Sequence, residues 1–270
     1  MQANTRHPSF DRWSQNPQAT ARIALACLDL TSLNEADTES DIARLCARAQ
    51  GPFGSVAAVC VWPRLAAFAR SQLPAAIAVA AVANFPDGSS DVARAINDTQ
   101  AIVQSGAQEV DLVLPYQQLQ AGDTAGVSQL LKAVRKAAGG LRLKVILETG
   151  ELRSESLIAQ AAQLSLDAGA DFLKTSTGKT NVSATPAAAR LLLSAIADNP
   201  HTAEQVGFKP SGGIRTVADA AVYIALCDDY LGPNALTPSR FRIGASSVLT
   251  DIEAVLGQAG QASVVPAGGY

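Results

Sequence analysis

Short apolar segments alternate with helix-like segments along most of the chain. Eight of the apolar segments are rich in β-branched residues and are bounded by turn residues. Most are nearly continuous apolar runs, which is typical of parallel strands covered on both faces. The eight predicted strands lie within residues 22–30, 55–62, 76–84, 109–115, 141–149, 171–176, 206–213 and 241–247.

The segments between these strands carry helix start and stop signals. Thr185 and Pro186 suit the N-cap and the first helical position of one helix. Gly106 and Gly169 follow two other helices, where a glycine allows a left-handed C-cap. Eight strand–helix units over residues 21–258 predict a single-domain α/β fold, a (β/α)₈ TIM barrel. A doubly wound open sheet is the alternative, but the first unit lacks a GxGxxG turn.

The two ends of the chain differ from the barrel. Residues 1–20 are polar and lack the apolar region of a signal peptide, so we expect a loose N-terminal arm on a cytoplasmic protein. Residues 259–270 are expected to form a flexible C-terminal tail. The longest apolar runs are well short of the ~20 residues that span a bilayer.

The composition of the chain limits the classes of function and of site that it can have. With 48% hydrophobic and 17% charged residues, the chain can bury a substantial core. A net charge of −3 without a basic block argues against nucleic acid or an anionic membrane as partner. The chain has two histidines, His7 and His201, which disfavours a catalytic zinc site or a histidine triad. No cysteine pair has CxxC spacing, and we expect neither a metal nor another cofactor.

The lysines are few and unevenly placed. Of the six, Lys132 and Lys136 are four residues apart on a predicted helix and are expected to be solvated. Lys174 lies on the sixth predicted strand and Lys209 on the seventh, and adjacent strands are ~4.8 Å apart. Burial and the like charge would lower the pKa of one of them and yield an amine nucleophile. The alternative is that both reach the barrel mouth and bind anions.

Carboxylates accompany these lysines. An inward Asp111, on the fourth predicted strand, could shuttle protons in carbonyl chemistry or serve as a structural hydrogen-bonding group. Asp29 ends the first strand and raises the same choice; we expect it to bind substrate. Lys144 is interpreted as an ion-pair partner of one of these acids. Glu148 and Glu151 flank a glycine turn and are interpreted as loop-packing groups.

Glycine turns follow the last two predicted strands. Glycine lets backbone N–H groups approach an anion closely, and a helix N-terminus favours negative charge. Turns after strands 7 and 8 are where TIM barrels bind phosphate. The serines in the second turn are either extra donors or helix caps. The residues concerned are Gly212 and Gly213 after strand 7, Gly244, Ser246 and Ser247 after strand 8, and the "STGK" run that ends at Lys179.

Together these motifs resemble the deoxyribose-phosphate aldolase family over residues 22–257. The matching segments are LDLTSL, VCVWPR, NFPDG, EVDLVLPY, LKVILETGEL, GADFLKTSTGK, VGFKPSGGIRT and RIGASS. The resemblance implies a metal-free class I aldolase on a (β/α)₈ barrel. It would reversibly cleave 2-deoxy-D-ribose 5-phosphate to D-glyceraldehyde 3-phosphate and acetaldehyde, a step of deoxyribonucleotide catabolism.

The resemblance also implies roles for individual residues. Lys174 would form the Schiff base, Lys209 would lower its pKa, and Asp111 would relay protons. Tyr270, at the end of the tail, would assist proton transfer. The substrate and phosphate positions would be Thr177, Gly178, Lys179, Gly212, Gly213, Gly244, Ser246 and Ser247.

Phosphosugars and aldehydes are therefore the expected partners, and a homodimer or larger homo-oligomer is compatible with the sequence. Two other functions remain open at this point. One is a phosphosugar isomerase that uses an acid–base pair without a covalent step. The other is a non-catalytic barrel that binds phosphometabolites. Neither of them needs a second buried cation next to Lys174.

Overall fold

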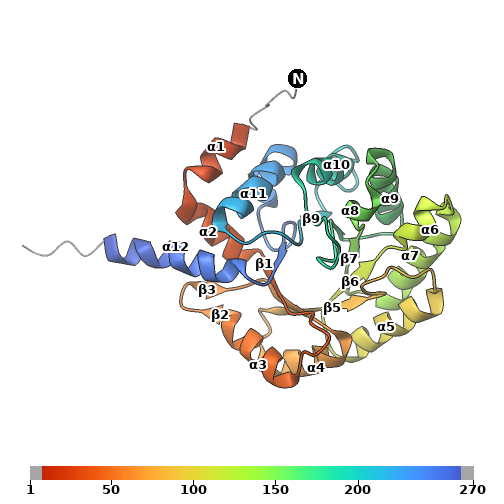
Figure 1. The fold of residues 1–270 in the computed structure, drawn as a ribbon, viewed down its shortest axis with the longest axis horizontal. Helices are drawn as coiled ribbons and strands as arrows, with labels where there is room; N and C mark the ends of the chain where they lie inside the picture. Colours follow the sequence, from red (N-terminus) through yellow and green to blue (C-terminus); the bar gives the residue numbers. More distant parts are fainter. Residues whose placement is uncertain (1–7, 263–270) are drawn as a thin grey trace, which may run out of the picture.

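The structure of the protein is a computed structural model that describes residues 8–262, with side chains described through residue 258. Its centre is a ring of eight parallel strands surrounded by helices, which confirms the predicted TIM-barrel fold (Figure 1). The strands are β1 Leu28–Thr31, β4 Ala58–Val61, β5 Ala78–Ala83, β6 Glu109–Val113, β7 Arg142–Ile146, β8 Phe172–Lys174, β9 Gly207–Lys209 and β10 Ile243–Ala245.

Hydrogen bonding joins the strands in the order β10-β1-β4-β5-β6-β7-β8-β9. Two isolated bridges, Phe208 to Phe241 and Ser211 to Gly244, link the two ends of this order and bring the sheet close to a closed barrel. Seven of the eight predicted apolar segments contain one of these strands, and the first, residues 22–30, covers all of β1 except Thr31. A separate pair, β2 Gln50–Gly51 and β3 Gly54–Ser55, forms a small antiparallel hairpin.

The helices alternate with the strands along the chain. Thr185 caps α10 by accepting a hydrogen bond from the Ala188 N–H, and Pro186 is the first residue of this helix, as predicted. The helices are α1 Pro8–Ser14, α2 Pro17–Ala26, α3 Glu39–Arg48, α4 Pro63–Gln72, α5 Val92–Gln104, α6 Tyr116–Gln120, α7 Thr124–Ala138, α8 Thr149–Leu152, α9 Glu155–Asp167, α10 Pro186–Ala197, α11 Val217–Leu231 and α12 Val248–Ala262, with a 3₁₀ turn η1 at Pro233–Ala235.

The N-terminal segment corrects one expectation. Residues 8–20 are not a loose arm, because they form α1 and most of α2, and α1 packs against α11. Trp13 is 5% exposed and its indole N–H donates to Asp228 at 2.8 Å, so an aromatic residue anchors an otherwise polar segment. The first predicted strand is also shorter than expected, because its beginning, from Arg22 on, belongs to α2.

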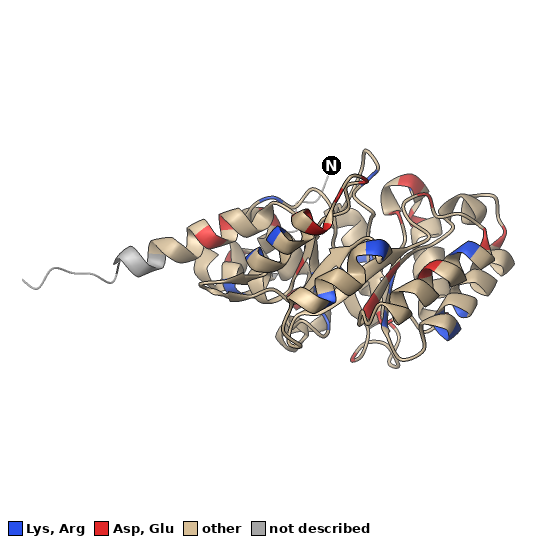
Figure 2. Ribbon diagram, turned by 90° about the horizontal axis from the view of Figure 1, so that it is seen from below, with Lys and Arg blue, Asp and Glu red and all other residues tan. Residues whose placement is uncertain are grey.

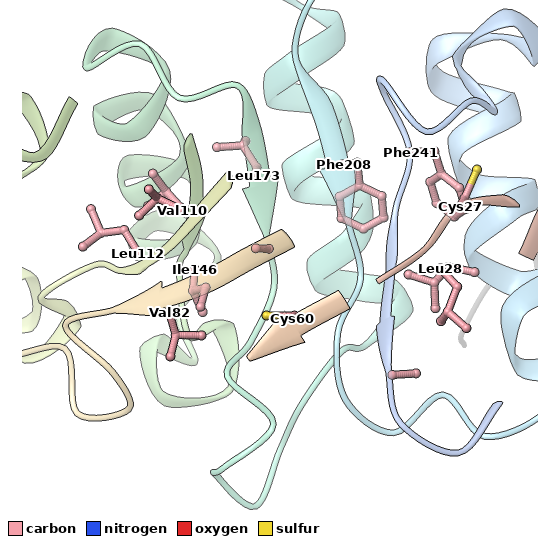
Figure 3. Packing of buried hydrophobic residues seen from close by; sticks show 14 of the residues in the cluster. Cys27, Leu28, Cys60, Val82, Val110, Leu112, Ile146, Leu173, Phe208 and Phe241 are labelled. Atoms are coloured by element: carbon pink, nitrogen blue, oxygen red, sulfur yellow. The ribbon is translucent and has the colours of Figure 1, made fainter. Parts of the chain in front are cut away.

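The strands divide their side chains between two environments. Outward residues such as Val110, Leu112 and Leu173 belong to the hydrophobic core formed with the helices (Figure 3). The residues between them point inward, because successive side chains of a strand face opposite sides. Register then aligns inward charges on neighbouring strands, with Asp111 beside Lys144 and Lys174 beside Lys209.

The outer helices carry charged residues of both signs (Figure 2). In the part of the chain that the structure describes, no helix is long and apolar enough to cross a membrane.

Candidate active site

The interior of the barrel is charged. Seven charged residues in the interior are each at most 2% exposed. Six of them lie on the strands, and the seventh, Arg242, immediately precedes β10. Four are cations and three are carboxylates, so one positive charge is left over if all are ionised. A surplus buried charge is costly, which favours the loss of one proton from this group. The cations are Lys144, Lys174, Lys209 and Arg242, and the carboxylates are Asp29, Glu109 and Asp111.

Asp111 on β6 is the centre of this cluster. Its Oδ2 lies 2.7 Å from Nζ of Lys174 and 2.7 Å from Nζ of Lys209, so one oxygen bridges the two lysines. Its Oδ1 accepts from Lys144 at 2.8 Å. Burial raises the pKa of Asp111, but the three ammonium groups outweigh burial and hold it well below the usual range. Asp111 is therefore a carboxylate at neutral pH.

Lys174 has the lowered pKa expected of an amine nucleophile. Burial is the main cause; the Asp111 carboxylate opposes it and the Lys209 ammonium adds to it. The prediction that one lysine of the pair has a depressed pKa thus agrees in direction with the structure. Desolvation contributes more to that shift than the neighbouring charge does.

Lys209 differs from Lys174 because it has a second carboxylate. Its Nζ contacts Asp29 as well as Asp111. Burial lowers the pKa of Lys209, but the two carboxylates outweigh it and the net shift is upward. Lys209 therefore stays protonated, whereas the pKa of its neighbour Lys174 is lowered.

Asp29, Glu109 and Arg242 form the floor below this centre. Arg242 pairs with Glu109 at 2.7 Å and with Asp29, and Lys144 pairs with Glu109 at 2.6 Å. Burial raises the pKa of Asp29 and Glu109, but the surrounding cations outweigh it and lower both. Asp29 is not in the cavity wall, so the structure supports a counter-ion role for it rather than the expected contact with substrate.

A cavity of about 320 Å³ opens at the carboxyl ends of the strands, directly above Lys174. Every residue expected to bind substrate or phosphate lines it, except Asp29. The members that the sequence predicted are Lys174, Thr177, Gly178, Lys179, Gly212, Gly213, Gly244, Ser246 and Ser247. Tyr270, the expected proton relay, lies outside the described residues.

The glycines in this wall have conformational or steric reasons to be glycine. Gly212 and Gly213 both have φ near +82°, a region that side chains rarely adopt. A Cβ on Gly244 would lie 3.0 Å from the Cε of Lys209, so a larger residue would press on this lysine. Successive backbone N–H groups in such a conformation form a concave site suited to an anion.

Two exposed cations complete the cavity wall. Lys179 donates from Nζ to the Leu33 carbonyl at 2.8 Å, and Arg215 follows the Gly212–Gly213 turn. Ser246 and Ser247 are exposed immediately before α12 begins at Val248. The cavity thus combines an amine at its base with cations, hydroxyls and glycine turns at its rim.

The sequence did not single out several members of this site. Thr31, the last residue of β1, and Ser32 and Asn34 in the loop after it enter the wall, and Ser211 and Arg215 flank the glycine turn. Their position directly after strands was the available signal. Among the described residues, no group of three or more histidine, cysteine or acidic side chains could hold a metal ion.

Comparisons with known proteins identify the family of the chain. A family model described as DeoC/LacD family aldolase matches residues 23–250. A curated relative, the deoxyribose-phosphate aldolase of Agrobacterium fabrum, is 48% identical over 259 residues, which cover 95% of this chain and 98% of the relative.

Solved structures show the same architecture. The apo crystal structure of a provisionally assigned deoxyribose-phosphate aldolase from Toxoplasma gondii ME49 matches with a TM-score of 0.83 and 25% identity, covering 90% of this chain and 99% of that one. A similarly assigned protein from Coccidioides immitis matches with a TM-score of 0.76 and 29% identity, covering 93% and 98%.

Proposed function

This chain belongs to the DeoC/LacD aldolase family, and we propose that it reversibly cleaves 2-deoxy-D-ribose 5-phosphate to D-glyceraldehyde 3-phosphate and acetaldehyde. The observation that carries the proposal is the Lys174–Asp111–Lys209 centre. One oxygen of Asp111 lies 2.7 Å from Nζ of both lysines, at the base of a cavity with an anion-binding rim.

Lys174 is the proposed nucleophile. Its lowered pKa raises the fraction of free amine at neutral pH. The amine attacks the C1 aldehyde of the open-chain sugar, and loss of water gives an iminium ion. The iminium accepts the electron pair of the C2–C3 bond as that bond breaks, which leaves an enamine on Lys174.

Asp111 and Lys209 are the proposed proton-transfer pair. As C2–C3 breaks, Asp111, together with Lys209 and a water molecule, takes the proton of the C3 hydroxyl, and C3 becomes the aldehyde carbon of glyceraldehyde 3-phosphate. A proton returned to C2 of the enamine gives the iminium of acetaldehyde, and hydrolysis regenerates the amine. The depressed pKa of Asp111 keeps it deprotonated at neutral pH, which leaves an oxygen free for the proton but also makes it a weak base, so the proton passes on to the water molecule.

The rim of the cavity is the proposed phosphate site. Lys179 and Arg215 supply positive charge, and the Gly212–Gly213 turn supplies backbone donors. Binding the phosphate there would orient C1 toward Lys174, so binding energy at the distal end would serve the chemistry. We also propose a cytoplasmic enzyme whose substrate is supplied by deoxyribonucleotide breakdown.

Two measurements test the proposal. Acetaldehyde release from 2-deoxyribose 5-phosphate, coupled to alcohol dehydrogenase and NADH, should follow enzyme concentration. Borohydride added with acetaldehyde should leave an ethyl group on Lys174, detectable by peptide mass spectrometry. Lys132, which is exposed on α7, serves as the internal control and should remain unmodified.

The same measurements separate the alternatives. An isomerase would convert a sugar phosphate without releasing acetaldehyde and without a borohydride adduct. A binding barrel would take up the sugar phosphate in calorimetry and turn over nothing. Either result would refute the aldolase assignment for this chain.

A further inference from the structure

Glu148 is a buried acid that the proposed mechanism does not use. It follows β7, is fully buried, and has a left-handed backbone with φ 53° and ψ 57°. Such a conformation is uncommon for a residue other than glycine, and it is found preferentially where a site requires it. Glu148 does not line the cavity, although it lies one strand away from Lys174.

The carboxylate of Glu148 is occupied by the loop after β8. The backbone N–H of Thr177 faces its two oxygens at 3.4 and 3.3 Å, and the Thr177 hydroxyl donates to Oε2. The Thr180 hydroxyl contacts Oε1 at 3.3 Å. Three donors of one short loop therefore converge on one side chain from the neighbouring strand.

The contact with Thr177 extends to Lys179. A hydroxyl has one proton, and that of Thr177 goes to Glu148, so its oxygen is free to accept. It accepts the backbone N–H of Lys179 at 3.0 Å. Gly178 between them has φ +78°. The orientation of the whole Thr177–Gly178–Lys179 turn, which lines the cavity, thus follows from Glu148.

Neighbouring contacts close the two segments on each other. The Thr149 N–H donates to the Thr175 carbonyl at 3.0 Å. A Cβ on Gly150 would lie 2.1 Å from the Val182 carbonyl oxygen, so the turn after β7 lies directly against the loop that carries Lys179. Among the described residues, Glu148 is the one carboxylate that accepts hydrogen bonds from the donors of this loop.

We propose that Glu148 is a positioning residue that holds the Thr177–Gly178–Lys179 turn in the geometry that binds the phosphate end of the substrate. The inference rests on the proposed function, because it assigns Glu148 to the phosphate half of that site. A residue with this task affects recognition of the phosphate and leaves the chemistry at Lys174 largely intact.

The test compares Glu148→Ala with wild type on two substrates, 2-deoxyribose 5-phosphate and unphosphorylated 2-deoxyribose. For the phosphorylated sugar we expect KM to rise about tenfold or more, the scale on which supporting residues affect a binding group. We expect kcat for that sugar to stay within about threefold. For the unphosphorylated sugar, kcat/KM should change less than about threefold. The matched control is Glu151→Ala, in the short helix α8 that follows Glu148; among the described residues its carboxylate forms an ion pair with Arg153, at 3.8 Å.

Two further variants keep the test decisive if Glu148→Ala folds poorly. Glu148→Gln retains the length and one acceptor oxygen, and should show a smaller KM increase. Thr177→Val removes the hydroxyl while keeping the backbone N–H. Its effect and that of Glu148→Ala should be non-additive in the double variant, because both remove the same contact.

The outcomes distinguish this inference from the proposed function. Equal losses on both sugars, or unchanged KM in Glu148→Ala, would overturn the positioning role while leaving the aldolase intact. If wild type releases no acetaldehyde, the proposed function fails, and titration with inorganic phosphate decides the inference. Weaker phosphate binding by Glu148→Ala than by Glu151→Ala would support it, and equal binding would overturn it.

Discussion

Lys144 and Lys174 are both buried lysines that bond to Asp111, from adjacent strands of one barrel. Lys144 contacts three carboxylates, at 2.6, 2.8 and 3.1 Å, and these outweigh burial and raise its pKa. Lys174 pairs with one carboxylate, which Lys209 shares, and its pKa falls. Lys144 is therefore a permanent cation, whereas Lys174 is positioned to lose its proton.

The difference shows that burial alone does not create an amine nucleophile. Burial lowers the pKa of both lysines, and the number of carboxylates within ion-pair distance decides the sign of the net shift. Within the cluster around Asp111, which does not include the buried Glu148, four cations face three carboxylates and one proton is in surplus. The lysine with the fewest carboxylate partners is the one that releases it.

The largest effect should come from removing the amine itself. In Lys174→Ala we expect turnover of 2-deoxyribose 5-phosphate to fall by about 10³-fold or more, because no other side chain replaces a covalent nucleophile. The borohydride adduct should disappear. Acetaldehyde release at the wild-type rate would show that Lys174 and Lys144 do not differ in the way described.

The next largest effect concerns the permanent cation. Lys144→Met keeps a similar volume but leaves Asp29, Glu109 and Asp111 with one cation fewer, and we expect unfolding free energy to fall by about 3–5 kcal/mol. Urea unfolding measures this loss. A variant as stable as wild type would mean that Lys144 is not the cation that binds these carboxylates together.

A pair of variants should shift the pKa of Lys174 in opposite directions. Lys209→Met removes a cation that lowers this pKa, so it should rise, and the free amine, together with kcat/KM, should appear only at higher pH. Glu109→Gln removes a buried carboxylate from the network, so the pKa of Lys174 should fall and the acidic limb of the profile should move to lower pH.

The pH dependence of kcat/KM in both variants measures these shifts. We expect at least about tenfold less activity for Lys209→Met at pH 7, because each unit of pKa changes the amine fraction about tenfold and because the proposed proton-transfer partner of Asp111 is lost as well. If the pH profiles of both variants moved in the same direction, net charge inside the barrel would not control the pKa of Lys174.

The smallest effect should come from a lysine outside the barrel. Lys132 is exposed on α7, so Lys132→Ala should leave kcat/KM unchanged and Tm within about 2 °C of wild type. Thermal unfolding and the coupled assay check both. A marked loss of activity would point to a role of this helix surface that the barrel interior does not explain.

The strands could be predicted from the sequence because each is covered on both faces and is therefore a nearly continuous apolar run, such as SVAAVCVW. Few other structures have this pattern. The N-terminal segment was misread for the converse reason. Trp13 lies in a polar segment, and its contribution to folding depends on the hydrogen bond with Asp228, a residue more than two hundred positions away. Local pattern could not reveal that contact.

The residue types and spacing of the chain were enough to predict a barrel and to bring Lys174, Lys209 and Asp111 forward as candidates, because parallel strands bring residues at the same height together; the roles proposed for them came from the family resemblance. Only the tertiary structure decided how the charges are shared. It decided how many carboxylates lie near each lysine, that Asp29 is not in the cavity wall, and that Glu148 binds the Thr177 turn. Each of these depends on contacts between side chains of strands that are distant in sequence. Coulomb energy and desolvation depend on those distances, which a linear sequence does not specify.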